Sequence, residues 1–383
     1  MESDKKIGSP VDPNGLEEYS VVFTDRSVNH MSNLFCTAMR DIAGALKETY
    51  SASAIAIVPG GGTYGMEAIA RLYANDARCL VLQHGWFSYR WSQILNTGSI
   101  TEDLITITAV NEIQDEIEQY RPDYLDVLIK RISEAQPALV FAPHVETSSG
   151  VLLPDDYLKE ITQVVHSYGG LFVLDCIASG ALWVDMNALG VDVLITAPQK
   201  GWSSTPCAAA ILFSENAVSV ADTLTSSSFT CDLNKWLSIT REYEAGGYAY
   251  HATLPTDSLI QFRDAINETR ACGMDALRDA QWNLGKRVRK LLEEHGYQSV
   301  AATGFQSPSV VVSYTDHPDI KNGLLFAEAG MQVAGGVPLM CGEPADFSTF
   351  RIGLFGLSKL TNIDDTVGKL ETVIGDVTSR SRK

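Results

Sequence analysis

An acidic residue and a lysine stand at the ends of two successive apolar runs. The first run, 172–174, leads into Asp175, and the second, 193–195, leads towards Lys200. Both runs are short, apolar and bounded by Gly or polar residues, which predicts buried strands. Ligands of open α/β sheets bind beyond the carboxyl ends of such strands. We therefore expect Asp175 and Lys200 at one edge of a sheet.

This pair of side chains suits pyridoxal phosphate. That cofactor withdraws electrons only while its ring nitrogen is protonated, and it is held as a Schiff base on a lysine amine. An acid and a lysine must therefore reach opposite ends of one ring. Because a lysine that follows a strand is by itself usually a surface residue, the hypothesis depends on Asp175 and Lys200 together.

A glycine-rich segment, 60–65 (GGGTYG), lies between a predicted strand at 54–58 and a predicted helix at 66–73. Free N–H groups at such a helix N-terminus favour an anion, so the segment is a candidate phosphate cradle. The same residues fit G-x-G-x-x-G, which keeps a dinucleotide-binding oxidoreductase as an alternative of another class. That site needs an acid at the end of the second strand. Here the second strand ends in Gln83-His84-Gly85, which weakens the alternative.

Strand and helix patterns alternate along most of the chain, which favours an α/β fold. With 383 residues and 45% hydrophobic content the chain exceeds the usual single-domain size, so we expect two domains. They are a large domain (19–259) after a flexible arm (1–18), and a small α+β domain (260–383). Strands are predicted at 54–58, 79–82, 138–141, 172–174, 193–195, 208–213, 309–313 and 351–354, and helices at 31–46, 66–73, 155–168, 259–295 and from 363 onward.

The composition narrows the class of partner. The chain has 29 Lys and Arg against 47 Asp and Glu, a net charge of −18, which argues against nucleic acid or an anionic membrane as principal partner. Seven cysteines without CxxC spacing indicate reduced thiols rather than disulfides or a metal site. The charged N-terminus has no signal-peptide pattern, and no apolar run reaches membrane-spanning length. We expect a cytoplasmic protein.

Seven motifs in order resemble the class V aminotransferases, especially the alanine-glyoxylate and serine-glyoxylate group, with 2-aminoethylphosphonate-pyruvate transaminase nearby. The likeness covers about residues 50 to 360, in the segments 60–68 (GGGTYGMEA), 84–90 (HGWFSYR), 144–150 (HVETSSG), 173–177 (VLDCI), 198–200 (PQK), 250–255 (YHATLP) and 351–353 (RIG). It implies fold type I of the pyridoxal phosphate enzymes. That fold has a mainly parallel, seven-stranded sheet flanked by helices, and a smaller C-terminal domain.

The resemblance also implies a role for each matching residue. Lys200 would form the Schiff base and move the proton between the substrate and the cofactor, and Asp175 would pair with the ring nitrogen. The remaining cofactor contacts would be Phe87 and Ile177 on the two ring faces, Thr147 at the ring hydroxyl, and Gly62, Thr63 and Gln199 at the phosphate. In a homodimer, Tyr250 and Thr253 would reach the phosphate of the partner subunit.

For the substrate, the resemblance implies that Arg351 binds a carboxylate through its planar guanidinium. The reaction would be ping-pong transfer of an amino group from a small amino acid to a small 2-oxo acid such as glyoxylate or pyruvate. His144 and Glu146 match the family motif, but no role follows for them.

Three departures from the family pattern bear on the site. Segment 24–30 (TDRSVNH) stands where relatives carry a Gly-Pro-rich pocket wall, which makes Arg26 a candidate substrate-binding residue. Tyr64 replaces a small residue in the glycine loop and would reshape the cofactor site. Cys341 lies in the region where related cysteine desulfurases carry their nucleophile, so a desulfurase or lyase is the nearest enzymatic alternative, although a buried thiol fits the sequence better.

Overall fold

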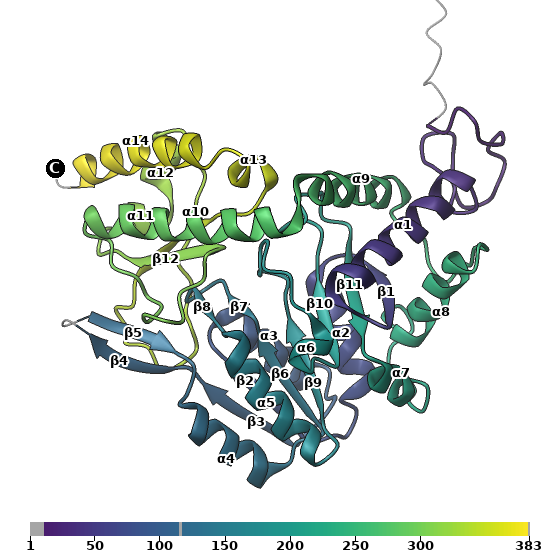
Figure 1. Cartoon of the computed structure of the whole chain (residues 1–383), viewed down its shortest axis with the longest axis horizontal. Coiled ribbons are helices and arrows are strands. Elements are labelled where there is room, and N and C mark those ends of the chain that lie inside the picture. Colours follow the sequence, from purple (N-terminus) through teal and green to yellow (C-terminus); the bar gives the residue numbers. More distant parts are fainter. Residues whose placement is uncertain (1–10, 115–116, 382–383) are drawn as a thin grey trace, which may run out of the picture.

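The computed structural model describes residues 11–114 and 117–381. Its centre is a seven-stranded sheet in the order β1-β11-β10-β9-β6-β2-β3 (Figure 1). The strands are β1 (Ala54–Pro59), β2 (Cys79–Gln83), β3 (Leu104–Thr108), β6 (Leu139–Pro143), β9 (Leu171–Asp175), β10 (Val193–Thr196) and β11 (Ala208–Phe213). β11 is antiparallel to both neighbours, while the other adjacent pairs are parallel. The predicted mainly parallel sheet is confirmed.

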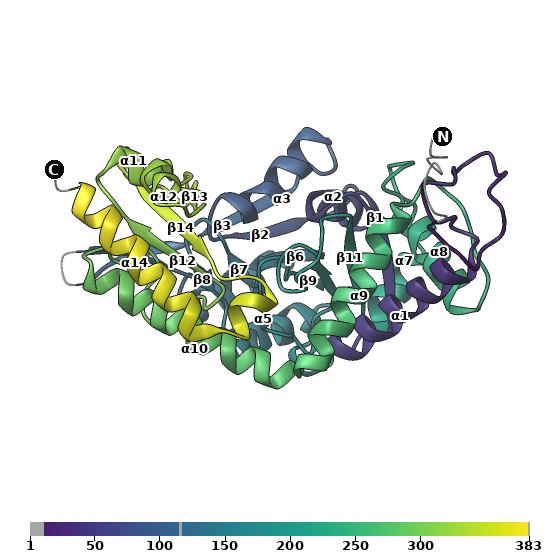
Figure 2. The ribbon, with the colours of Figure 1, turned by 90° about the horizontal axis from the view of Figure 1, so that it is seen from above.

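Helices cover both faces of this sheet, as right-handed crossovers require. The chain moves one way across the sheet through α2 (Gly62–Tyr73) and α3 (Trp86–Thr97), and moves back through α4 (Leu125–Ala135), α5 (Asp155–Ser167) and α6 (Met186–Leu189). Figure 2 shows α2 and α3 on one face and α5 on the other. Further helices of this part are α1 (Asn33–Tyr50), α7 (Glu215–Ala221), α8 (Leu233–Glu244) and α9 (Thr256–Cys272). Two additional small sheets are formed by β4 (Val110–Gln114) with β5 (Ile117–Arg121), and by β7 (Val145–Glu146) with β8 (Val151–Leu152).

The C-terminal part has its own antiparallel sheet, in the order β12-β14-β13. Its elements are α10 (Met274–Glu294), β12 (Val310–Tyr314), α11 (Pro318–Lys321), α12 (Leu324–Glu328), β13 (Ala334–Gly335), β14 (Thr349–Gly353), α13 (Leu357–Leu360) and α14 (Ile363–Ser381). α10 and α14 pack side by side along this sheet (Figure 2). A second apolar core, separate from that of the large sheet, fills the space between them.

The predicted single helix from 259 to 295 is wrong. The chain forms two helices, α9 and α10, which meet at Gly273. Gly273 has φ +88°, a left-handed conformation that ends a helix and that glycine adopts without a steric penalty. Phe262 of α9 packs in the core of the large sheet, whereas Leu277 of α10 packs in the second core. We propose that the two packing units divide at Gly273; the expected boundary at 259/260 stays a prediction.

The N-terminal segment lies at the opposite end of the molecule from the C-terminus (Figure 2). Of the arm expected over 1–18, residues 1–10 lie outside the described residues, and 11–18 form neither helix nor strand. No helix within the described ranges is long and apolar enough to cross a membrane.

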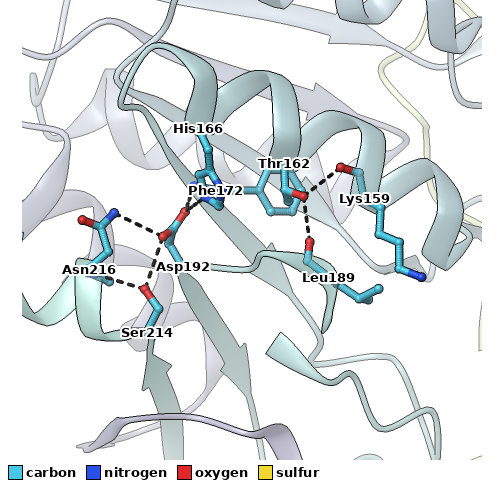
Figure 3. Close-up of polar contacts among 9 residues, drawn as sticks. Lys159, Thr162, His166, Phe172, Leu189, Asp192, Ser214 and Asn216 are labelled. Carbon is cyan, nitrogen blue, oxygen red and sulfur yellow. Dashed lines mark hydrogen bonds and ion pairs between the residues drawn. The ribbon is translucent and has the colours of Figure 1, made fainter. Parts of the chain in front are cut away.

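A buried acid holds the amino ends of β9 and β10 together. The Asp192 carboxylate accepts hydrogen bonds from His166 Nε2 and from the main-chain N–H of Phe172, both at 2.8 Å, and from Ser214 Oγ at 3.2 Å (Figure 3). It thereby joins α5, β9 and the start of α7. The hydrogen bond to Asp192, the largest contribution, raises the pKa of His166 above its ordinary value of 6.5. Because β9 and β10 lead to Asp175 and Lys200, this contact fixes the two strands that carry the predicted pair.

His166→Gln is expected to lower the melting temperature more at pH 5.5 than at pH 9. A raised folded-state pKa means that the ionic contribution is fully present below pH 6.5 and is lost as the pH rises through the folded-state value. The effect should stay below about 1 kcal/mol because the imidazole is partly exposed. His295→Gln is the matched control, since His295 bonds a main-chain carbonyl instead of an acid. Thermal denaturation at both pH values tests this, and an equal loss at both would contradict it.

Candidate active site

A cleft of about 190 Å³ opens at the carboxyl edge of the large sheet. Its walls come from the start of α2, the start of α3, and the segments that follow β6, β9 and β10. Of the residues predicted from the sequence, eight line it: Gly62, Thr63, Phe87, Thr147, Asp175, Ile177, Gln199 and Lys200. Side chains from segments far apart in the sequence therefore meet at the edge where the strand pattern places them.

Asp175 is the last residue of β9, and it stands beside Ile195 of β10 in the parallel register. Its Oδ1 accepts a hydrogen bond from the Ile177 N–H at 2.9 Å. The carboxyl faces the cleft, so part of its surface is accessible, but protein atoms surround it on the other sides. Burial, the largest cause, and the nearby Glu146 charge together raise the pKa of Asp175 to about 7, although the Ile177 hydrogen bond and the charges of Arg90 and Lys200 act in the opposite direction. The side chain is therefore ready to ionise when a cation is placed next to it.

Lys200 lies on the loop that follows β10. Burial lowers the pKa of its amine, and the charge of Arg351 lowers it further, while Asp175 acts in the opposite direction. A lowered pKa increases the neutral fraction of an amine, which is its nucleophilic form. Close packing fixes the loop, because a Cβ added at Gly201 would lie 2.1 Å from the Gly180 carbonyl oxygen. The loops that carry Lys200 and Asp175 thus rest directly on each other.

The start of α2 is a cradle for an anion. No hydrogen-bond acceptor within the described part of the chain meets the N–H groups of Gly62 and Thr63, and Gly61 provides no side-chain cap. A Cβ at Gly62 would lie 2.3 Å from Ile177 Cδ1, so only glycine lets the helix approach the cleft this closely. These N–H groups and the helix dipole favour a phosphate at this end.

Glu146 is a buried acid whose role the sequence did not reveal. Its carboxylate accepts hydrogen bonds from the N–H groups of Phe87 (3.2 Å) and Ser88 (2.7 Å) at the start of α3, and from the Ser88 and Ser148 hydroxyls. The positive end of the α3 dipole further stabilises its charge. Glu146 therefore fixes the first turn of α3, and with it the position of the Phe87 ring in the cleft.

Arg351 of β14 lies beside the cleft. Its guanidinium is 5.5 Å from the centre of the Phe87 ring, and its Nε donates to the Gly335 carbonyl oxygen at 2.9 Å. No acid within residues 11–114 and 117–381 forms a salt bridge with it. A half-buried guanidinium in this state can bind a carboxylate through both remaining nitrogens.

Besides Arg351, four predicted site residues do not line the cleft of their own chain. Tyr64 is exposed, and its ring lies against Gly60. Arg26, Tyr250 and Thr253 lie on the outer surface, where the Tyr250 hydroxyl is 3.1 Å from the Thr253 hydroxyl. The His30 ring, 5.5 Å from the Tyr250 ring, joins segment 24–30 to this pair. Segment 24–30, which carries Arg26, therefore lies next to Tyr250.

Cys341 is poorly suited to nucleophilic chemistry. Its thiol donates to the Gln83 carbonyl oxygen at 3.3 Å, and burial raises the pKa of the thiol to about 12. A thiol with this pKa stays protonated near neutral pH, whereas the thiolate is the reactive form. The structure does not favour the cysteine desulfurase alternative.

Comparison with known proteins agrees with this geometry. A family model described as aminotransferase class-V matches residues 16–353. The chain belongs to the class V aminotransferases. The resemblance drawn from the seven motifs is confirmed, and the dinucleotide alternative for 60–65 has no support. The cofactor of this class V aminotransferase is pyridoxal phosphate.

Three individual proteins illustrate the similarity. A 2-aminoethylphosphonate–pyruvate transaminase of Syntrophobacter fumaroxidans is 26% identical over 307 residues, covering 78% of this chain and 77% of that protein. A Synechococcus protein named soluble hydrogenase, small subunit, is 24% identical, with coverage of 91% and 88%. The structure of an alanine–glyoxylate aminotransferase from Nostoc has a TM-score of 0.77 at 22% identity, covering 92% of this chain and 89% of that one.

The cleft of this class V aminotransferase fits its cofactor. The Asp175 carboxyl accepts one hydrogen bond, from the Ile177 N–H. A protonated ring nitrogen next to it would lower its raised pKa, so that the carboxylate could pair with that cation. The buried Gln199 Oε1 finds no partner in the described part of the chain. The free N–H groups of α2 suit a phosphate. Asp175, Lys200 and the α2 cradle would therefore hold the ring nitrogen, the carbonyl carbon and the phosphate.

Asp175→Asn is expected to raise the melting temperature of the cofactor-free protein at pH 8. An acid whose folded-state pKa is raised to about 7 destabilises the fold as the pH rises from its ordinary value of 3.8 to about 7. Asparagine keeps the Ile177 contact without carrying a charge, so we expect a gain on the order of 1–3 kcal/mol. The gain should shrink at pH 5.

Thermal denaturation of both cofactor-free proteins at pH 5 and pH 8 measures this difference. Asp279→Asn, an exposed position on α10, is the control and should change little at either pH. A gain that is the same at both pH values would rule out the charge of Asp175 as its cause.

Proposed function

We propose that this enzyme moves an amino group from a small amino acid to a small 2-oxo acid of the glyoxylate or pyruvate type, by a ping-pong mechanism. One observation carries the proposal. Asp175 and Lys200 share one cleft, with the pKa of the acid raised and that of the amine lowered, and Arg351 lies at its side. The similarity to a 2-aminoethylphosphonate–pyruvate transaminase and to an alanine–glyoxylate aminotransferase supports this substrate class.

When bound, pyridoxal phosphate supplies a carbonyl carbon for the amino group and an electron-withdrawing ring. The Asp175 carboxylate holds the proton on the ring nitrogen, so the ring keeps its electron-withdrawing form. Lys200 is the covalent anchor. Its neutral Nζ would also be the base that accepts the proton from the substrate Cα and returns it.

Arg351 orients the substrate by binding its carboxylate, so that the Cα–H bond faces Lys200. Phe87 and Ile177 would hold the two faces of the ring, and Thr147 would donate to its hydroxyl group. Phe87 stays in place because Glu146 fixes the main chain of the same helical turn. These contacts exclude water from the ring faces and leave the proton path to Lys200.

Lys200→Ala and Arg351→Gln distinguish attachment of the cofactor and proton transfer, proposed for Lys200, from binding of the substrate carboxylate, proposed for Arg351. Lys200→Ala should remove the visible absorption band of the attached cofactor and reduce transamination by at least about 10³-fold, because anchor and proton carrier are both lost. Arg351→Gln should keep the band but raise KM for carboxylate substrates by about tenfold or more. Absorption spectra and two-substrate kinetics measure both. A colourless wild-type protein, or unchanged kinetics of both variants, would contradict the proposal.

We also propose a homodimer in which each chain completes the site of the other. Tyr250 and Thr253 carry hydroxyl groups on an exposed surface of their own chain, where they have only each other as side-chain partners in the described residues. In the dimer they would reach the phosphate of the partner subunit. Arg26 belongs to segment 24–30, which lies next to Tyr250 through the contact of His30, so it would face the partner's substrate. Location in the cytoplasm stays a prediction.

Mixed dimers test this arrangement. Co-expression of Lys200→Ala chains with Tyr250→Ala/Thr253→Ala chains should restore about a quarter of the wild-type activity, because half of the dimers then contain one intact site. Each variant alone should be nearly inactive. The control pairs Lys200→Ala with Arg351→Gln, two residues of the same chain's site, and should give no more activity than the Arg351→Gln chains give alone. Recovery in neither mixture would place Tyr250 and Thr253 outside the partner's site.

A further inference from the structure

Arg90 is a cation of the cleft that has no assigned role. It lies one turn after Phe87 on α3, lines the cleft and is half-buried. Its Nη1 donates to Thr63 Oγ1 at 2.8 Å, and its guanidinium is 5.2 Å from the centre of the Phe87 ring. Within the described ranges it forms no salt bridge, although acids outnumber bases in the chain by 47 to 29.

A guanidinium held in this way is prepared for an anion. The contacts with Thr63 and Phe87 fix its direction without neutralising its charge, and its partly exposed guanidinium remains open to a ligand. Thr63 is in the first turn of α2, whose free N–H groups form the phosphate cradle. The guanidinium and the helix N-terminus therefore act on the same end of the cleft.

The second such guanidinium has a different neighbourhood. Arg351 lies over the same Phe87 ring but comes from β14 and bonds the Gly335 carbonyl oxygen, and within the described residues it has no hydrogen bond to α2. The charge of Arg351, and not that of Arg90, lowers the pKa of Lys200. Arg351 thus acts where the substrate must meet the lysine, whereas Arg90 bonds the first turn of α2 and its charge lowers the pKa of Asp175.

We propose that Arg90 binds the phosphate group of the cofactor together with Thr63 and the N-terminus of α2. This inference rests on the proposed function, since it assigns a further ligand to the cofactor of that reaction. The positive guanidinium attracts a phosphate dianion more strongly than the main-chain N–H groups of α2 do alone. We therefore expect Arg90 to increase the affinity for the phosphorylated cofactor and not for its dephosphorylated form.

The experiment compares pyridoxal phosphate with pyridoxal, which lacks only the phosphate. Both are titrated into the cofactor-free full-length wild type, Arg90→Gln, Arg90→Lys and Arg351→Gln, and binding is followed by the absorption band of the attached aldehyde. Arg90→Gln should weaken pyridoxal phosphate by about tenfold to hundredfold and leave pyridoxal unchanged within about twofold. Arg90→Lys should lie between, because it keeps the charge but loses the planar donor pair. Arg351→Gln removes a charge that lowers the pKa of Lys200, so it should change the affinity for both ligands by the same factor and leave their ratio unchanged.

Each contrary outcome has one meaning. Equal weakening of both ligands by Arg90→Gln would show that Arg90 only supports the shape of the cleft and would overturn the inference. Unchanged affinity for pyridoxal phosphate, with loss of activity only towards diacidic substrates, would overturn it in favour of a substrate contact. If the wild type bound neither ligand, that result would contradict the proposed function itself. Melting temperatures of the variants establish that each is folded.

Discussion

Two groups of opposite charge share one poorly hydrated cleft without neutralising each other. Asp175 and Lys200 form no salt bridge within the described residues, and burial shifts both towards their neutral forms. A direct ion pair would stabilise the cofactor-free protein but would occupy both groups. Keeping them apart costs stability and leaves the acid available to a cationic ring nitrogen and the amine available to a carbonyl carbon. The remaining parts of the site can be understood as the means of maintaining this separation.

Close main-chain packing and buried polar contacts provide the rigidity. Gly201 rests on the Gly180 carbonyl oxygen, so neither loop can move towards the other. Gln281 of α10 donates to the Pro308 carbonyl oxygen at 2.9 Å and accepts from the Ala181 N–H at 3.3 Å, which links the C-terminal part of the chain to the loop after Asp175. A buried amide with both ends bonded is costly to displace. The C-terminal part thus supports the edge of the sheet that carries Asp175, and it also carries Arg351.

The sequence predicted the parts of the site that depend on local pattern. Apolar runs ending at Asp175 and near Lys200 marked buried strands, and parallel strands bring their carboxyl ends to one edge. Glu146 escaped prediction because its donors at Phe87 and Ser88 lie 59 and 58 residues away, a relation that no local pattern contains. The break at Gly273 was missed because the amphipathic pattern continues on both sides of it. Tyr250 and Arg26 follow no pattern within one chain, since their proposed ligand belongs to another subunit.

The charge of the cleft is opposite to that of the whole molecule. A chain with a net charge of −18 places Arg90 and Arg351 over the Phe87 ring, and Lys200 over the Phe355 ring. Bulk charge acts over long distances and is screened by salt, whereas basic side chains in and beside a cleft of about 190 Å³ act at short range. The overall charge therefore says little about the ligand. The unneutralised cations of the cleft instead favour ligands with anionic groups, a phosphate at the α2 end and a carboxylate beside Arg351, with the amino group delivered between them to Lys200.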